Sequence, residues 1–241
     1  MFPYHDENET ERTPVITIAL IAVCVLAWVL VQGAGNERAV SESVCNYGLI
    51  AGELTGGAAV GSGVPLGEGL YCAVDAGPEY MSIFTSMFLH GGWMHLLGNM
   101  WFLWLFGNNI EDAMTRPRFV LFYLLCGVAA AMLQVLSNPA SAVPMIGASG
   151  AISGVMGAYL VLYPKVKVYT LVPLGFFTTT YPLPAWVMLL YWAALQLFGG
   201  FGAGEGGVAF WAHVGGFIAG AALVKLFARG DRILTQWRPS N

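Results

Sequence analysis

Long apolar stretches, separated by shorter polar or glycine-rich segments, dominate the pattern of hydrophobic and polar positions along this chain. Six of these runs predict helices. In chain order they are Val15–Val31, Trp93–Ile110, Phe119–Leu136, Gly150–Tyr163, Pro184–Phe201 and Val208–Phe227. Because a helix needs about 20 apolar residues to cross a bilayer, the runs predict an all-α, polytopic membrane protein whose six transmembrane helices form one bundle.

The composition supports this prediction. The chain is 57% hydrophobic and 10% charged, whereas soluble domains are about 45–50% apolar and about 25% charged. These values exclude an ordinary soluble fold and indicate a lipid bilayer as the environment. The formal net charge of −4, without a cluster of basic residues, argues against nucleic acid as a partner.

The pattern divides the chain into one membrane domain and two tails. The predicted parts are an amino-terminal cytoplasmic tail (1–14), a membrane domain (15–228) and a carboxy-terminal cytoplasmic tail (229–241). Within the membrane domain, residues 33–80 are expected to form a long outer loop rich in glycine and acidic residues. Cys45 and Cys72 share this loop, where oxidation is chemically possible, but the sequence leaves open whether they form a disulfide.

The distribution of basic residues predicts the orientation. If the amino terminus is cytoplasmic, nine of the 10 lysines and arginines lie in inner segments, and Arg38 alone lies outside. This arrangement satisfies the positive-inside rule. We therefore predict that both termini are cytoplasmic, in the inner (plasma) membrane of a bacterium.

The fourth apolar run, Gly150–Tyr163, is unusually short. Its 14 residues span about 21 Å as a helix, whereas the hydrocarbon core is about 30 Å thick. Pro164 and Lys165 hold its inner end at the cytoplasmic surface, so its outer end stops below the opposite surface. Ser149 lies at that submerged end. Unpaired N–H groups there must face protein or water, so the run length predicts a cavity at Ser149.

His213 lies inside the last apolar run, which enters the membrane from the same side as the fourth. An ionisable residue within a span is costly and indicates function, and a neutral imidazole can accept the proton of a serine hydroxyl. Two plainer interpretations remain. The glycines around Ser149 could form a helix-packing face with an incidental serine, and His213 could be a core histidine bonded to a backbone carbonyl.

A third polar group lies at the outer end of the second run. His95 and Asn99 are four residues apart and therefore share one helix face. Their side chains could donate hydrogen bonds to a developing oxyanion. Hydrogen bonding between helices is the alternative, and is favoured for Asn99 taken alone. His90 precedes the run. It is either a loop or capping residue or a part of the site.

These motifs resemble those of the rhomboid intramembrane serine proteases. The matching patterns are H-x4-H-x3-N in the second run, G-x-S-G before the fourth and A-H-x-x-G in the sixth. They occur in the family's order, so the resemblance covers residues from about 15 to 228. It implies that Ser149 is the nucleophile and His213 the general base, without a required carboxylate. It further implies that the Ser149 backbone N–H, His95 and Asn99 stabilise the oxyanion.

The resemblance also implies an activity, namely hydrolysis of peptide bonds in or near transmembrane segments of other membrane proteins, without metal or cofactor. Transmembrane proteins would be the substrates, and the sequence does not define the oligomeric state. His90, Gly147 and Gly150 would support the site. Glu111 matches a structural acidic position outside it.

Two other functions fit the sequence less well. A catalytically inactive rhomboid-like protein that binds transmembrane helices would need neither Ser149 nor His213, so the presence of both disfavours it. A transporter or channel is disfavoured because no acidic residue lies well inside any apolar run, whereas most ion and proton pathways use one.

Three positions depart from the family pattern. Ser153 stands where the family often has an aromatic residue stacked on the catalytic imidazole, so another group must orient His213. The Trp-Arg pair common in the first outer loop is missing from residues 77–88. Val208 stands where the family usually has glycine, so we expect the fourth and sixth helices to pack slightly differently than in other members.

Overall fold

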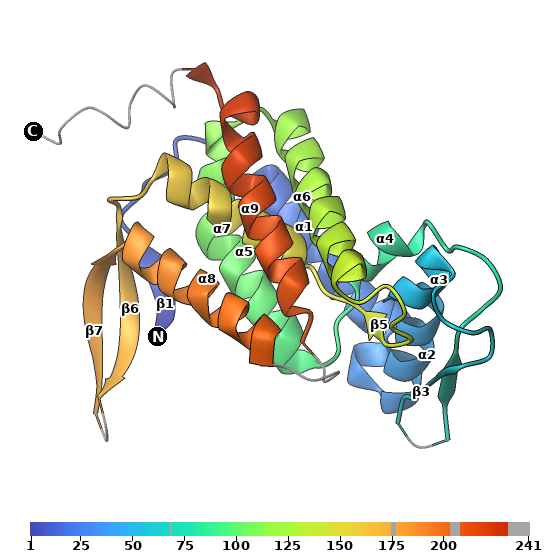
Figure 1. Ribbon diagram of the computed structural model, residues 1–241. Helices are drawn as coiled ribbons and strands as arrows, with labels where there is room; N and C mark the ends of the chain where they lie inside the picture. Colours follow the sequence, from blue (N-terminus) through green and yellow to red (C-terminus); the bar gives the residue numbers. More distant parts are fainter. Residues whose placement is uncertain (68, 175–176, 203–207, 231–241) are drawn as a thin grey trace, which may run out of the picture.

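The predicted apolar runs form the long helices of the bundle (Figure 1) in the computed structural model, which describes residues 1–67, 69–174, 177–202 and 208–230. The helices are α1 (Val15–Leu26, continued by a π-helical turn over Ala27–Val31), α5 (Trp93–Ala113), α6 (Arg116–Ser137), α7 (Ser149–Leu162), α8 (Ala185–Gly202) and α9 (Phe210–Phe227). Each begins and ends within three residues of its predicted limits.

Among the described helices, α6 and α9 are both long enough and apolar enough to cross a membrane. The helices α1, α7 and α8 are apolar but shorter by the same measure. The 21-residue α5 is long, but it carries asparagines and acidic residues in its last turns. Length and composition therefore identify two of the six predicted spans.

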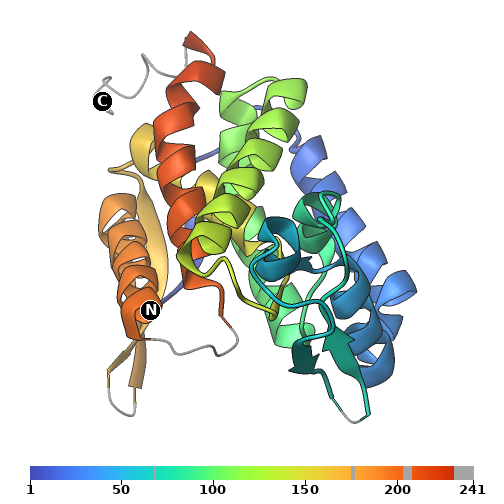
Figure 2. The same cartoon turned by 45° about the vertical axis from the view of Figure 1, so that its right-hand side comes forward.

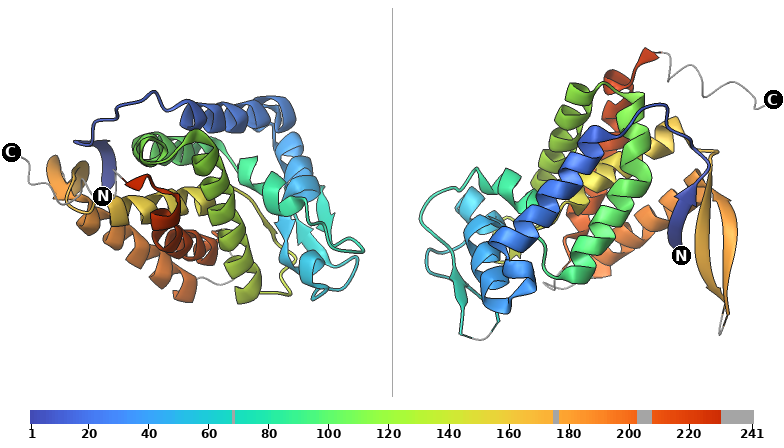
Figure 3. Two further views of the ribbon diagram at one scale, coloured as in Figure 1. Left: turned by 90° about the horizontal axis from the view of Figure 1, so that it is seen from above. Right: turned by 180° about the vertical axis from the view of Figure 1, so that it is seen from behind.

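Helix α7 lies at the centre of the bundle. It packs most extensively against α9, and also against α6, α5 and α8, while α1 runs along the edge of the bundle beside α5 (Figure 3, left). Most of the α7 side chains are buried. A helix that is apolar on all sides is expected in such a position, and Ser149, its first residue, is partly buried.

Residues 33–80, predicted as a loop, contain several short elements at one end of the bundle (Figure 2). They are a 3-10 turn (Gly33–Gly35), α2 (Glu37–Tyr47), β2 (Leu49–Ile50), α3 (Ala51–Thr55), β3 (Gly63–Pro65) and β4 (Tyr71–Ala73), followed by α4 (Ser82–Thr85) and a 3-10 turn (Ser86–Phe88). Helix α2 begins where the Asn36 side chain accepts a hydrogen bond from the Ala39 N–H, a preferred amino-terminal cap. We call residues 33–80 the outer layer.

A disulfide between Cys45 and Cys72 links α2 to β4, with the Cα atoms 5.4 Å apart. It resolves the alternative that the sequence left open. The outer layer is also joined to the chain before α7, because β2 pairs with β5 (Pro144–Met145) in antiparallel register. The Gly52 N–H adds a hydrogen bond of 2.8 Å to the Ser141 carbonyl oxygen.

A three-stranded antiparallel sheet stands beside the bundle, which differs from the prediction of an all-α fold (Figure 1; Figure 3, right). Strands β6 (Lys167–Leu174) and β7 (Phe177–Pro184) form a hairpin, and β1 (Phe2–Asp6) pairs with β6. In β6, Val168 and Thr170 are buried and their neighbours are more exposed, the two-residue period of a strand rich in β-branched residues. Part of the predicted amino-terminal tail is therefore ordered.

Asp6 fastens β1 to the bundle. Its carboxylate accepts hydrogen bonds from the Tyr159 hydroxyl of α7 and from the Asn109 side-chain amide of α5, the latter at 3.0 Å. Trp101 of α5 donates from Nε1 to the Pro3 carbonyl oxygen at 2.8 Å. Burial raises the pKa of Asp6 above its ordinary value. Strand β1 thus connects α5, α7 and the hairpin.

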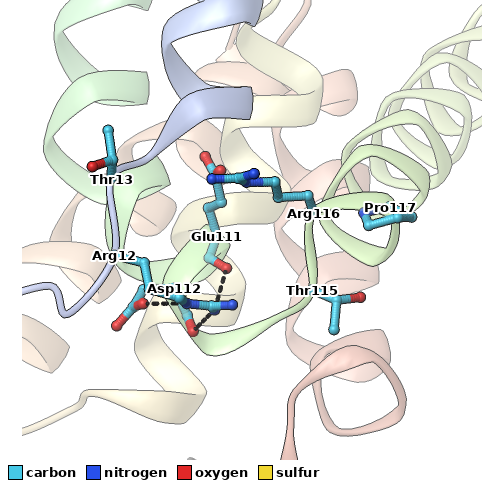
Figure 4. A pocket seen from close by; sticks show the side chains of 7 residues that line it. All are labelled: Arg12, Thr13, Glu111, Asp112, Thr115, Arg116 and Pro117. Carbon is cyan, nitrogen blue, oxygen red and sulfur yellow. Dashed lines mark hydrogen bonds and ion pairs between the residues drawn. The ribbon is translucent and has the colours of Figure 1, made fainter.

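Charged residues meet where α1 and α6 begin and α5 ends, around a cavity of about 300 Å³ (Figure 4). Arg12 forms an ion pair of 3.0 Å with Asp112. The Glu111 carboxylate accepts hydrogen bonds from the backbone N–H groups of Ile16 and Thr17, at 2.9 and 2.7 Å. It satisfies two otherwise unpaired donors at the start of α1, so its contacts here are structural.

Candidate active site

The turn before α7 makes Ser149 the first residue of that helix. Gly147 has a φ of 122°, and its N–H donates to the Ser86 carbonyl oxygen at 2.8 Å. A Cβ atom at Gly147 would lie 2.8 Å from Nε2 of His95. Glycine is therefore required here both by the backbone conformation and by the space that the His95 ring occupies.

His213 of α9 faces Ser149. Its Nε2 atom lies 2.7 Å from Ser149 Oγ, which is a hydrogen-bonding distance. The two residues are 64 positions apart in the sequence, and each sits in the first turns of its helix. The structure therefore brings together the hydroxyl and the imidazole that the sequence singled out.

Glycines allow α7 and α9 to touch through their backbones. A Cβ atom at Gly216 would lie 1.9 Å from the Gly150 carbonyl oxygen, and one at Gly220 would lie 1.9 Å from the Gly154 carbonyl oxygen. With no side chain between the helices, the distance between Ser149 and His213 follows from main-chain packing. Val208 is exposed and precedes α9, outside this contact.

His95 lies against the turn that carries Ser149. Its Nδ1 atom accepts a hydrogen bond of 3.2 Å from the Gly91 N–H. The neutral ring therefore carries its proton on Nε2, the atom that faces Gly147. The Asn99 amide donates to the His95 carbonyl oxygen at 2.9 Å, within its own helix, and keeps a second N–H hydrogen. His95 thus reaches the Ser149 turn, whereas this bond of Asn99 stays within α5.

His90 packs against His95. The two imidazole rings are in edge contact, with centroids 5.2 Å apart. The Gln32 side chain holds the main chain of His90 through two hydrogen bonds of 2.8 Å. Burial, with a smaller contribution from His95, lowers the pKa of His90 to about 3. His90 is therefore a neutral packing partner of His95 near pH 7.

Two residues of α8 that the sequence analysis did not single out surround the ring of His213. The Gln196 side-chain oxygen lies 2.7 Å from His213 Nδ1, and the Trp192 ring lies 5.9 Å from the imidazole centroid. The Ser153 hydroxyl instead donates to the Ser149 carbonyl oxygen at 2.6 Å. The orienting group that Ser153 cannot supply thus comes from α8. The feature of the sequence that could have pointed to Gln196 is that it is a single amide in an apolar run.

A cavity of about 20 Å³ adjoins Ser149 and Gly150. Small side chains of α6 and α9, among them Ala130, Ala131 and Ala212, contribute to its wall. A volume of this size holds about one water molecule. A group that enters it without displacing the wall must be as small as a methyl group.

Residues 77–230 match the model of the Rhomboid domain. The chain is similar to Rhomboid protein 1, mitochondrial, of Saccharomyces cerevisiae, with 31% identity over 146 residues, which are 58% of this chain and 40% of the relative. It is similar to Rhomboid protease GluP of Bacillus subtilis, with 37% identity over 82 residues, 34% of this chain and 16% of the relative. Rhomboid-like protease 5 of Toxoplasma gondii is 32% identical over 149 residues, 59% of this chain and 16% of the relative.

The chain therefore spans less than half the length of these relatives. Two of them are proteases by name, which supports protease activity at the level of the family. The matched domain contains Ser149, His213, His95 and Asn99, and it covers more than half of the chain. This protein belongs to the rhomboid family of integral membrane proteins.

Proposed function

We propose that this protein is an intramembrane serine endopeptidase, which hydrolyses peptide bonds in or near transmembrane segments of other membrane proteins. The observation that carries the proposal is the 2.7 Å distance between Ser149 Oγ and His213 Nε2, at the start of a buried 14-residue helix. The names of two relatives support the same class of reaction. An inactive protein that binds transmembrane helices would not require this contact.

In the proposed reaction, Ser149 Oγ attacks the substrate carbonyl carbon, and its proton passes to His213 Nε2. The electron pair of the carbonyl bond moves onto the oxygen, which the Ser149 backbone N–H, the Nε2–H of His95 and the Asn99 amide stabilise. The imidazolium then protonates the leaving amine as the C–N bond breaks. Finally, His213 takes a proton from water as the water oxygen attacks the ester carbon, and it returns that proton to Ser149 Oγ as the ester bond breaks and the acid product leaves.

The proposed topology has six transmembrane helices and cytoplasmic termini. Arg12 and Arg229 both contact Asp112. Arg116 opens α6 beside Arg12 and Asp112 (Figure 4), and this gathering of arginines supports a cytoplasmic assignment of that end. The disulfide in the outer layer then faces an oxidising compartment. A bacterial inner membrane fits this orientation. The predicted carboxy-terminal tail lies mostly outside the described residues.

The decisive experiment is labelling with a serine-directed fluorophosphonate, combined with cleavage of a model transmembrane substrate. Wild-type protein should be labelled and active, and Ser149→Ala should fold but lose both signals. Ser153→Ala is a matched control, because it removes another hydroxyl of α7, one that bonds within that helix among the described residues. Labelling or cleavage by Ser149→Ala at the wild-type level would rule out Ser149 as the nucleophile. Absence of both signals in the wild type would instead favour the inactive protein that binds transmembrane helices.

A further inference from the structure

Gln196 places a polar amide within the apolar helix α8. A buried or membrane-embedded amide costs free energy unless it is hydrogen bonded. The bond that the structure gives to this side chain is the 2.7 Å contact from Oε1 to His213 Nδ1. The amide oxygen of Gln196 and Nδ1 of His213 therefore satisfy each other.

This contact determines where the imidazole carries its proton. A neutral histidine has one N–H, on either Nδ1 or Nε2. An amide oxygen is only an acceptor, so its contact places the proton on Nδ1 and leaves a lone pair on Nε2. Nε2 is the atom 2.7 Å from Ser149 Oγ. The opposite tautomer would present an N–H to the serine and could not take its proton.

Helix α8 also fixes the plane of the ring. Trp192 lies one helical turn before Gln196, and its ring centroid is 5.9 Å from that of His213. Trp192 contacts Phe217 as well, at 6.0 Å, one turn after His213 on α9. Gln196 therefore holds the edge of the imidazole while Trp192 lies against it. Among the described residues, the other titratable side chain at this site is His95, whose Nε2 atom faces Gly147 in the turn before Ser149.

We propose that Gln196 is a positioning residue of the Ser149–His213 pair, whose side-chain oxygen keeps the imidazole in the tautomer and orientation that accept the serine proton. When Ser149 attacks, the proton moves to Nε2, and the imidazolium keeps donating its Nδ1 proton to Gln196. When the Nε2 proton passes to the leaving amine, the original tautomer returns. The Nδ1 proton stays in place throughout, which makes Gln196 a neutral counterpart of the aspartate in a catalytic triad.

Two substitutions at position 196 separate the positioning role from a packing role. Gln196→Met removes the acceptor and keeps the length, and should lower kcat by about 10- to 100-fold with little change in KM. Gln196→Glu keeps an acceptor oxygen. It should retain much higher kcat than the Met variant and move the acidic limb of the pH–rate profile upward by about one pH unit or more. Leu197→Met is the control, because Leu197 is exposed on the same helix and should leave kcat unchanged.

A packing role predicts the reverse order, because burying a carboxylate costs more than burying a thioether. The positioning role is therefore overturned if Gln196→Met keeps the wild-type kcat, or if Gln196→Glu is no more active than Gln196→Met. The positioning role of Gln196 rests on the proposed protease function only through these activity measurements.

A second measurement does not require activity. In protein labelled with 15N-histidine, the ring nitrogen shifts report which nitrogen carries the proton, and a His213→Asn variant assigns the His213 signals among the four histidines. We expect a single tautomer protonated at Nδ1 in the wild type and a mixture in Gln196→Met. Unchanged shifts in Gln196→Met would refute the proposal. Absence of Ser149-dependent cleavage would refute the protease function while leaving this result interpretable.

Discussion

Replacing Gly216 by alanine tests whether main-chain packing between α7 and α9 sets the distance between the serine and the imidazole. The added Cβ atom would lie 1.9 Å from the Gly150 carbonyl oxygen and 2.9 Å from its carbonyl carbon. Both atoms belong to the backbone of α7, so neither can rotate away as a side chain could. The alanine variant must therefore separate the two helices.

The size of this separation follows from the contact. A carbon atom rarely approaches an oxygen more closely than 3.0 Å, so the helices must move apart by about 1 Å in a densely packed interior. The same movement stretches the 2.7 Å contact between Ser149 Oγ and His213 Nε2 beyond the usual hydrogen-bond range of about 3.0 Å. A misplacement of about 1 Å reduces catalysis by about 100-fold, and overpacking costs about 1–3 kcal/mol of unfolding free energy.

The assay is cleavage of a model transmembrane substrate, with thermal unfolding of the same detergent-solubilised preparations. Gly98→Ala is the matched control, because Gly98 is also helical but has no atom within 4 Å of its added Cβ. It should keep wild-type activity and gain slightly in stability, because alanine favours helix over glycine. If Gly216→Ala behaves like Gly98→Ala in both measurements, main-chain contact does not set the distance between Ser149 Oγ and His213 Nε2.

Three further predictions concern other parts of the molecule. Cys45→Ser should lower the free energy of unfolding by about 3 kcal/mol, because it removes a disulfide between residues 27 positions apart. Reductant should lower the Tm of the wild type to that of the variant and leave the Tm of the variant unchanged. Burial raises the pKa of Asp6, so the folded state holds that proton more tightly. Its contribution to stability is full below the ordinary aspartate pKa and is lost as pH rises through the raised pKa. Asp6→Asn should flatten the dependence of Tm on pH in that window, and an unchanged slope would contradict this. Substrates with alanine before the scissile bond should have higher kcat/KM than those with leucine, because the cavity beside Ser149 holds about 20 Å³; equal values would show that this cavity does not receive that residue.

The long helices could be predicted because their signal is local. Each apolar run is bounded by polar, glycine or proline residues, and the 14-residue helix beginning at Ser149 shows in the sequence as a run too short for a membrane. The meeting of Ser149 with His213 was inferred from depth and from the glycines on both helices. The structure adds the reason, which is direct contact of backbone with backbone.

Features that depend on distant pairing were not predictable in the same way. Strand β1 pairs with residues more than 160 positions away, and five residues of a polar tail carry no periodic signal strong enough to reveal this. The disulfide depends on the Cα distance between Cys45 and Cys72, which sequence spacing does not determine. Gln196 is a single amide in an apolar run, but a sequence does not show the direction in which such a side chain points.

The pairing of β2 with β5 has a consequence for building chimeras. The matched Rhomboid domain begins at residue 77, so most of the outer layer lies upstream of it, yet Leu49 and Ile50 align with the two residues that lead toward Ile146 and the glycine turn. An exchange of the upstream segment alone would leave Pro144 and Met145 with a foreign partner strand. A chimera that preserves the conformation of the turn before Ser149 must carry both strands together.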